Sequence, residues 1–330
     1  MLSRLIFYCV CTITLTAACN IAFAQRSVDA ARDYPARPIR VVIGFTPGGQ
    51  PDIVMRLIAP KLGESLSQPL VVDNRPGAGG VVGTKIVAEA PPDGYTLLTA
   101  SSSHTISPAI YAKLPYQPLK DFVGVSMTSN ATYVLATSAA LGVKNVKELV
   151  AMAKAKPGQL NFSSAGTGSG THFAGEVFKQ ATQIEALHVP YKGVPEALND
   201  AIGGRVQFTM APLGSSIGLM RDGRLRGLAV SSIKRTGLFP DMPTIAESGY
   251  PGFRWDSWGG LFAPAKTPRA IINKLNREVV RVLNDPDIQQ RLTGMGMVAA
   301  PTTPEQLDKF VAEQLALVMQ LAKKAGIQPR

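Results

Sequence analysis

Short runs of apolar and β-branched residues alternate with longer amphipathic stretches along most of the chain. In the first part, this pattern predicts helices over 51–66 and 82–90 and strands over 39–45, 69–73 and 95–100. A β-α-β-α-β order of this kind is typical of a parallel sheet with helices on both faces. Pro60 lies inside the first predicted helix, where we expect it to introduce a kink.

A similar order resumes near residue 146. The pattern there predicts helices over 146–155, 171–182 and 196–202, and strands over 161–164, 186–189, 206–210 and 225–230. Two further segments, 126–137 and 253–262, are extended, and 268–325 is almost entirely helical. Two α/β units joined by two extended crossings predict a hinged, two-lobe α/β fold. We expect lobe 1 over 25–128, lobe 2 over 129–255, and a return to lobe 1 with C-terminal helices over 256–330.

The N-terminus has the pattern of a cleavable signal peptide. Arg4 precedes an apolar run over 5–18, and Ala22-Phe23-Ala24 places small residues where a signal peptidase reads them, which predicts cleavage after Ala24. Asn20 interrupts the run before it reaches the length of a membrane span, which is about 20 residues. A lipoprotein acylated at Cys19 is disfavoured, because Thr16 stands where such sites prefer a bulky aliphatic residue. We therefore expect a periplasmic protein.

Composition removes several classes of function. The three cysteines, Cys9, Cys11 and Cys19, all lie in the predicted signal peptide, so the mature chain has no disulfide and no cysteine nucleophile. The three histidines lack the spacing of metal ligands, and we expect no metal and no cofactor. A formal net charge of +11 favours anionic partners. The basic residues are dispersed without interleaved aromatics, which disfavours nucleic acid and leaves a small anionic solute.

Ligands of open α/β sheets bind beyond the carboxyl ends of the strands, which directs attention to two glycine-rich turns. Each turn connects a predicted strand to a predicted helix, so backbone N–H groups and a helix N-terminus can meet an anion there. The turns face each other across the cleft in a two-lobe fold and could hold a carboxylate from both sides. The candidate residues are Phe45, Gly48, Gly49 and Asp52 in the first turn, and Thr167, Gly168, Ser169, Thr171 and His172 in the second.

Four other candidates lie beyond strand ends, namely Ser102, His104, Tyr191 and Lys192. His104 follows a serine run, and Tyr191 with Lys192 could supply a phenol and a cation. Structural roles stay open for several candidates. Asp52 could stabilise its own helix N-terminus instead of contacting an amine on the ligand, and His172 could be a structural hydrogen-bonding group.

Two motifs known from enzymes occur in the sequence, but neither is complete. Residues 214–218 match the Gly-x-Ser-x-Gly nucleophile elbow, but that fold needs a histidine later in the chain, and none follows His188. Gly166-Thr167-Gly168 begins a dinucleotide-binding motif, yet Thr171 replaces its last glycine. We therefore expect a binding protein and not an enzyme.

Ten short motifs occur together and in order from Tyr34 to about Gly326. They are Tyr34-Pro35, Arg37-Pro38-Ile39, Gly48-Gly49 with Asp52, Asn74-Arg75-Pro76-Gly77-Ala78-Gly79-Gly80, Pro92-Asp93-Gly94-Tyr95-Thr96-Leu97-Leu98, Lys120-Asp121-Phe122, Gly168-Ser169 with His172, Val189-Pro190-Tyr191-Lys192-Gly193, Asp241-Met242-Pro243-Thr244-Ile245-Ala246-Glu247-Ser248-Gly249, and Trp258-Gly259-Gly260-Leu261. In this combination the chain resembles the substrate-binding proteins of tripartite tricarboxylate transporters, the Bug-type periplasmic receptors.

This resemblance implies a Venus-flytrap fold that closes on a small carboxylate. In such receptors two loops and ordered waters hold one carboxylate, and by motif matching those loops are 45–52 and 166–172 here. The resemblance also implies a membrane permease of one large and one small subunit as partner, and we expect the receptor to be a monomer. Two alternatives stay open: a sensory module that presents its ligand to a membrane kinase, and an exported hydrolase.

Overall fold

The computed structural model describes residues 33–324 and 327–329. The predicted signal peptide, residues 1–24, therefore lies outside the described part of the chain. Within that part, no helix has the length and apolar character needed to cross a membrane.

Parallel strands β1, β2 and β3 form one end of the molecule. β1 (Ile39–Ile43) lies between β2 (Leu70–Asn74) and β3 (Thr96–Ser101) and pairs in parallel with both. The connections contain helices α2 (Gln50–Leu66), α3 (Val81–Ala88) and α4 (Ser103–Ile110), with a short 3₁₀ turn, η1 (Ala78–Gly80), before α3. Pro60 lies within α2 without ending it.

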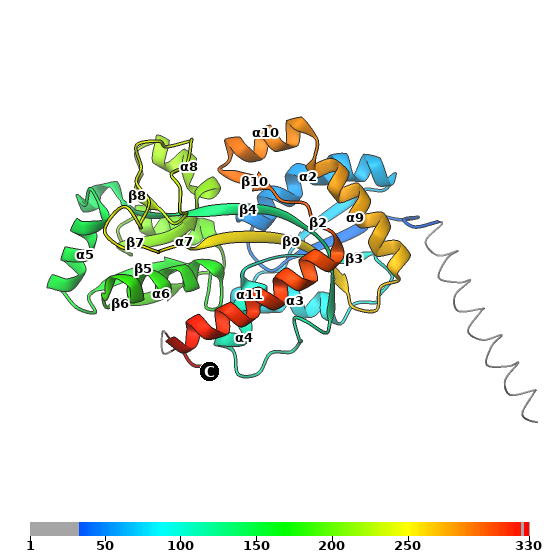
Figure 1. Cartoon of the computed structure of the whole chain (residues 1–330), viewed down its shortest axis with the longest axis horizontal. Helices are drawn as coiled ribbons and strands as arrows, with labels where there is room; N and C mark the ends of the chain where they lie inside the picture. The colour runs from blue at the N-terminus through cyan, green and yellow to red at the C-terminus, as the bar shows by residue number, and fades with distance from the viewer. Residues whose placement is uncertain (1–32, 325–326, 330) are drawn as a thin grey trace, which may run out of the picture.

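A second parallel group lies at the other end (Figure 1). β5 (Leu160–Ser164) pairs in parallel with β6 (Ala186–Pro190) and β7 (Phe208–Pro212). Its connections and flanks are α5 (Val146–Ala155), α6 (Gly170–Thr182), α7 (Val194–Ile202), α8 (Leu213–Arg221) and β8 (Leu225–Val230). The side chains of Asn145 and Ser169 cap α5 and α6, which explains why these helices begin where they do.

Two long strands join the ends. β4 (Phe122–Ser138) and β9 (Asp256–Pro264) run antiparallel, side by side across the middle of the molecule (Figure 1). They connect the strands into one path, β2-β1-β3-β9-β4-β7-β5-β6. A 3₁₀ turn, η2 (Ala139–Leu141), follows β4. These are the two predicted extended crossings, and we call β4 and β9 the hinge strands, the β1–β3 end lobe 1 and the β5–β8 end lobe 2.

The C-terminal region adds α9 (Arg269–Leu283), α10 (Pro286–Gly294), the short strand β10 (Met297–Ala299), which pairs with β4, and α11 (Pro304–Lys324). α11 extends beside both lobes (Figure 1). Leu307 and Val311 near its start pack into a lobe 1 cluster, whereas Val318 and Ala322 pack into the main cluster of lobe 2. The last helix therefore contacts both lobes instead of returning to lobe 1 alone.

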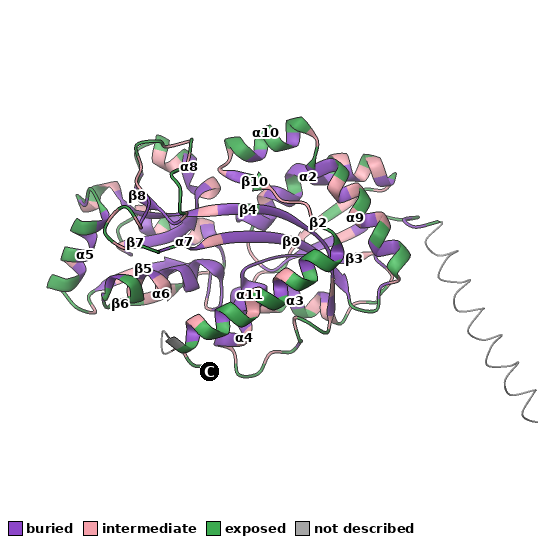
Figure 2. Ribbon diagram, viewed as in Figure 1, coloured by how far each residue is buried: buried purple, intermediate pink, exposed green. Residues whose placement is uncertain are grey.

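Each lobe contains a large apolar cluster. The lobe 1 cluster contains Ile39, Met55 and Ile58, and the lobe 2 cluster contains Phe162 and Phe208 and extends to Ile106 and Ile110 of α4. The hinge strands are largely buried, while the outer faces of the helices are exposed (Figure 2). Burial of each large apolar side chain contributes roughly 1.5–3 kcal/mol, so the two cores hold the loops between them in fixed positions.

Candidate ligand-binding cleft

A small cavity of about 30 Å³ lies between the lobes, beside the hinge strands. Its lining comes from both lobes: Phe45, Gly49, Gln50, Pro51 and Ser101 from lobe 1, Tyr133 and Ser257 from the hinge strands, and Ala165, Ser169, Gly170, Thr171, Val194 and Pro212 from lobe 2. Four of the predicted residues, Phe45, Gly49, Ser169 and Thr171, thus lie together across the cleft.

Five helices begin at or next to this cavity. The lining includes the first residues of three helices: Gln50 of α2, Gly170 of α6 and Val194 of α7. It also includes Pro212, directly before α8, and Ser101, directly before the N-cap residue of α4. A helix N-terminus carries a partial positive charge and N–H groups without intrahelical acceptors. Among the lining residues only Tyr133 has an ionisable side chain. The cavity therefore favours an anion through backbone dipoles and not through side-chain charge.

The start of α6 carries a network of hydroxyl groups. Ser169 Oγ accepts the His172 N–H at 3.2 Å and lies 2.9 Å from Thr171 Oγ1. Thr171 Oγ1 in turn accepts the Ala165 N–H at 2.8 Å. The two oxygens are thereby oriented by the backbone, and one of their hydroxyl protons can point at a ligand, as can the N–H groups at the start of α6.

The hinge contributes Tyr133. Its hydroxyl lies against the start of α6, because a Cβ added to Gly170 would stand 2.4 Å from it. Burial raises the pKa of Tyr133 to about 12. Tyr133 is thus a neutral hydrogen-bonding group in the cavity at physiological pH.

Asp52 stabilises the first glycine-rich turn and does not point into the cavity. Its carboxylate accepts the Gly48 N–H at 2.9 Å, the Asn74 Nδ2 group at 3.1 Å and the Arg56 Nε group at 2.9 Å. Asp52 is 3% exposed and does not line the cavity. Of the two roles left open by the sequence, the structure favours the structural one.

Three hydrogen bonds connect the lobes around the cavity. Tyr111 Oη donates to the Thr167 carbonyl at 2.8 Å, Thr46 Oγ1 donates to Glu196 Oε2 at 2.9 Å, and Ser215 Oγ donates to the Gly48 carbonyl at 2.9 Å. Gly79 also touches the Thr167 carbonyl so closely that an added Cβ would stand 1.9 Å from its oxygen. The lobes are therefore closed on each other.

These contacts account for the Gly-x-Ser-x-Gly segment. It lies in the first turns of α8, where Ser215 bonds to Gly48 of lobe 1 and a Cβ on Gly214 would stand 2.6 Å from the Met295 carbonyl oxygen. The segment is a contact between the lobes and not a nucleophile elbow.

Thr167, Tyr191 and Lys192 lie beside the cavity and not in it. They line a separate groove of about 190 Å³ with residues 77–79, Tyr111, Gly166 and Pro190. The Tyr191 hydroxyl donates to the Asp200 carboxylate, and burial together with this hydrogen bond raises the pKa of Tyr191 to about 12. Lys192 is exposed. Direct contact of these three side chains with a ligand is not supported by their positions.

The two predicted histidines also lie outside the cavity lining. His172 Nδ1 accepts the Gly168 N–H at 3.3 Å, so it holds the second turn in shape. His104 is 1% exposed and packs against the rings of Tyr116, Phe122 and Phe262. The sequence suggested a site residue at this strand end, but α4 begins there and turns His104 into the apolar core of lobe 1.

Several lining residues were missed. Gln50, Pro51 and Gly170 belong to the two predicted loops but were not singled out, and Tyr133 and Ser257 lie on the predicted crossings. The alternation of buried and exposed positions does not mark the hinge residues, because both faces of the hinge strands are buried. Only the fold brings them to the cleft. Ser102 lies one residue outside the lining, with its Cβ 3.4 Å from a Cβ added to Gly170.

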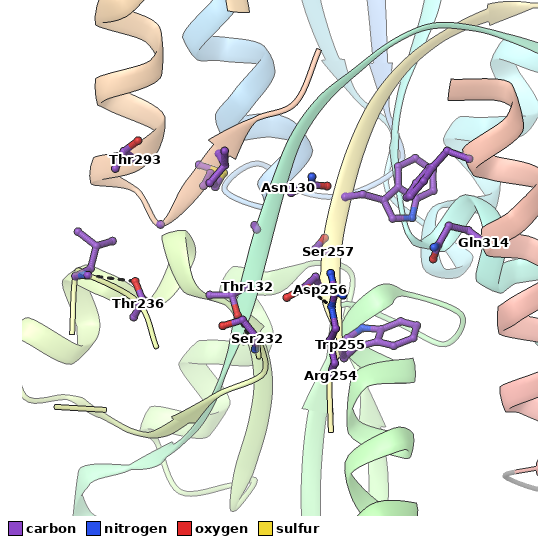
Figure 3. Close-up of a pocket in the computed structure, with 18 of the residues that line it drawn as sticks. Asn130, Thr132, Ser232, Thr236, Arg254, Trp255, Asp256, Ser257, Thr293 and Gln314 are labelled. Atoms are coloured by element: carbon purple, nitrogen blue, oxygen red, sulfur yellow. Dashed lines mark hydrogen bonds and ion pairs between the residues drawn. The ribbon is translucent and has the colours of Figure 1, made fainter. Parts of the chain in front are cut away.

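A larger groove of about 940 Å³ follows the hinge strands and reaches α11, β10 and the segment after β8 (Figure 3). Its lining includes Thr132, Ser232, Trp255 and Gln314. Arg254 also lines the groove, but its side chain is 63% exposed and is paired with the Asp256 carboxylate at 2.9 Å. Neither glycine-rich turn reaches this groove. Despite its size, it lacks the convergence of helix N-termini that marks the smaller cavity. Among the described residues, no cluster of three or more His, Asp or Glu side chains could hold a metal ion.

Comparisons with known proteins agree with this architecture. The periplasmic binding protein BugD is 32% identical and superposes with a TM-score of 0.87 over 90% of this chain and 100% of its own. Rpa4515 of R. palustris, solved with adipate, is 34% identical with a TM-score of 0.88 over 90% and 100% of the two chains. MatC from Rhodopseudomonas palustris, solved with bound malate, is 31% identical with a TM-score of 0.84 over 88% and 100%.

The predicted two-lobe periplasmic-binding-protein fold is thereby confirmed, and these neighbours are binding proteins and not enzymes. A sequence profile of the tripartite tricarboxylate transporter family receptors matches residues 54–327. The chain therefore belongs to the tripartite tricarboxylate transporter family of receptors, and the resemblance seen in its motifs is confirmed.

Proposed function

We propose that this protein is a periplasmic receptor that captures a small organic carboxylate between its lobes and delivers it to a tripartite membrane permease. The observation that carries the proposal is the convergence of helix N-termini on a cavity whose lining has no charged side chain. Such a site attracts an anion without a fixed counterion. The adipate and malate in two related structures support a carboxylate as the anion.

Closure follows from the division of the site between the lobes. Phe45 and Gly49 of lobe 1 and Ser169 and Thr171 of lobe 2 can contact one ligand together only when the lobes meet. A ligand that binds the closed form better than the open form shifts the population toward it. The lobe-to-lobe hydrogen bonds, such as Tyr111 to Thr167, stabilise the closed form in addition to the ligand. A closed receptor then presents a surface that a permease can distinguish from the open one.

Removal of the Ser169 hydroxyl tests the second turn. We expect Ser169→Ala to weaken binding about tenfold, because one charge-assisted hydrogen bond contributes roughly 1.5–3 kcal/mol. The variant also loses the N-cap of α6, at about 1 kcal/mol of stability. Binding is measured by calorimetry, and stability by urea denaturation.

Asn145→Ala is the matched control, because Asn145 caps α5 of the same lobe and does not line the cavity. This variant should lose similar stability and keep wild-type affinity. Equal affinity in the Ser169 and Asn145 variants would remove the Ser169 hydroxyl from the binding site.

Delivery to a permease is tested in cells. Deletion of the gene should abolish uptake of the recognised acid, and expression of the full chain should restore it. A chain without residues 1–24 should fail to restore uptake, because it would not reach the periplasm. Uptake that is independent of this chain would instead favour a role in sensing.

A further inference from the structure

The first residue of α2 places a buried amide group at the cavity. Gln50 is 3% exposed, lines the cavity and donates from Nε2 to Ser129 Oγ on β4 at 3.1 Å. Its Oε1 is buried and has no hydrogen-bond partner among the described residues. Buried polar atoms are nearly always paired, so an unpaired amide end in a ligand cavity points to a partner on the ligand.

A second unpaired group lies at the start of α4, one residue beyond the cavity lining. Ser102, the N-cap residue of α4, is 3% exposed, and its Oγ also lacks a partner among the described residues. It faces the start of α6, since its Cβ would stand 3.4 Å from a Cβ on Gly170. Lobe 1 thus offers two neutral hydrogen-bonding groups, while lobe 2 supplies the hydroxyl network of Ser169 and Thr171.

The charges around the cavity decide what these neutral groups can recognise. No lining residue carries a carboxylate, and the nearby Asp52 carboxylate is paired with Arg56 at 2.9 Å. An ammonium group would therefore meet helix N-termini with no carboxylate in the cavity lining to offset their positive potential. A methylene group would leave Gln50 Oε1 unpaired, whereas a hydroxyl group can donate a hydrogen bond to this amide oxygen.

We propose that the preferred ligand is a hydroxycarboxylate, and that Gln50 determines this preference by hydrogen bonding to the ligand hydroxyl. The proposal rests on the proposed function of the cleft as a carboxylate site. It adds a requirement for one uncharged polar substituent on the acid. Sites built around a hydroxyl discriminate strongly against analogues that lack it, because their own polar groups are then left unpaired.

The test uses matched acids that differ by one hydroxyl: malate and succinate, lactate and propanoate, 3-hydroxybutyrate and butyrate. Dissociation constants are measured by calorimetry on protein that has been unfolded, dialysed and refolded to remove any bound solute. For at least one pair we expect the hydroxy acid to bind at least tenfold more tightly. In Gln50→Leu this ratio should fall to within about twofold, because the variant removes the free amide.

Gln207→Leu is the matched control. The Gln207 amide accepts the Asn161 N–H in lobe 2 and does not line the cavity, so its loss should leave the ratio unchanged. A second variant, Gln50→Glu, keeps the side-chain shape and adds a negative charge, so it should weaken every acid in the panel.

The binding data distinguish a wrong hydroxyl preference from a wrong proposed function. Equal binding of hydroxy and deoxy acids by the wild-type protein would overturn the hydroxyl preference and leave the carboxylate site standing. Tighter binding of aspartate than of malate would overturn it in favour of an amino group. If the primary amides of these acids bind as well as the acids, the proposed function itself fails.

Discussion

Replacing Gly79 with alanine should prevent the lobes from closing. Gly79 adopts φ +62° in the turn before α3, and an added Cβ would stand 1.9 Å from the Thr167 carbonyl oxygen of the other lobe. The oxygen belongs to the backbone and the Cβ is rigidly attached to the backbone, so neither can move aside without separating the lobes. The ligand would then contact one lobe only, and we expect its dissociation constant to rise about a hundredfold or more, equivalent to about 3 kcal/mol. Calorimetry measures the affinity, and small-angle X-ray scattering measures the compaction on ligand binding.

Gly223→Ala separates this clash from backbone strain. Gly223 has a similar φ of +68°, but an added Cβ there meets nothing within 4 Å. Both variants place alanine in the left-handed region, at about 1–2 kcal/mol. Only the Gly79 variant should lose affinity and ligand-induced compaction. Wild-type affinity in that variant would show that the ligand does not require this closed arrangement.

Acid should destabilise the protein through His104. Burial lowers the pKa of His104 to about 4 from its ordinary value of 6.5. Between these two pH values the unfolded chain binds the proton and the folded one does not, so stability falls as the pH falls. The contribution is fully present above pH 6.5 and lost by about pH 4. A pKa difference of one corresponds to about 1.4 kcal/mol, so the contribution of His104 amounts to about 3 kcal/mol.

We therefore expect the free energy of unfolding to decrease from pH 7 to pH 4 by about 3 kcal/mol less in His104→Leu than in the wild type. Urea denaturation at both pH values measures this decrease. Phe122→Leu, in the same aromatic cluster, changes packing without removing a titratable group and should keep the wild-type pH dependence. If His104→Leu shows the wild-type pH dependence as well, the acid sensitivity arises elsewhere.

The architecture could be predicted from the sequence because its signals are local. Most strands and helices follow from apolar periodicity, and the two loops of the cleft follow from glycine-rich turns after strands. Helix α8 was not predicted, and β10 lies inside the segment predicted to be almost entirely helical. α4 was missed because its sequence, with Pro108 inside an eight-residue helix, lacks a helical pattern. The missed helix also explains the misjudged His104, since a strand end followed by a helix turns the side chain into the core.

Residues that meet only through the fold could not be found in this way. Tyr133 and Ser257 lie on different strands, β4 and β9, far apart in sequence, and no local sequence signal marks either of them. Gln50 was read as part of a turn, and its role depends on the contact with Ser129 on β4. Gly79 stands out in the sequence only as part of the motif over 74–80, whereas the structure shows that the close approach of the other lobe requires a glycine there.

Binding of a carboxylate in the cleft is tested by a thermal-melt screen of residues 25–330 against small organic acids and their primary amides. Refolded protein is used, so that no solute from expression remains bound. At a hundred times its dissociation constant, a ligand adds about 2.7 kcal/mol of stability, which raises the melting temperature by a few degrees. We expect the melting temperature to rise with at least one acid and to stay unchanged with the amide of that acid. Equal shifts with acid and amide, or stabilisation by neutral solutes alone, would contradict it.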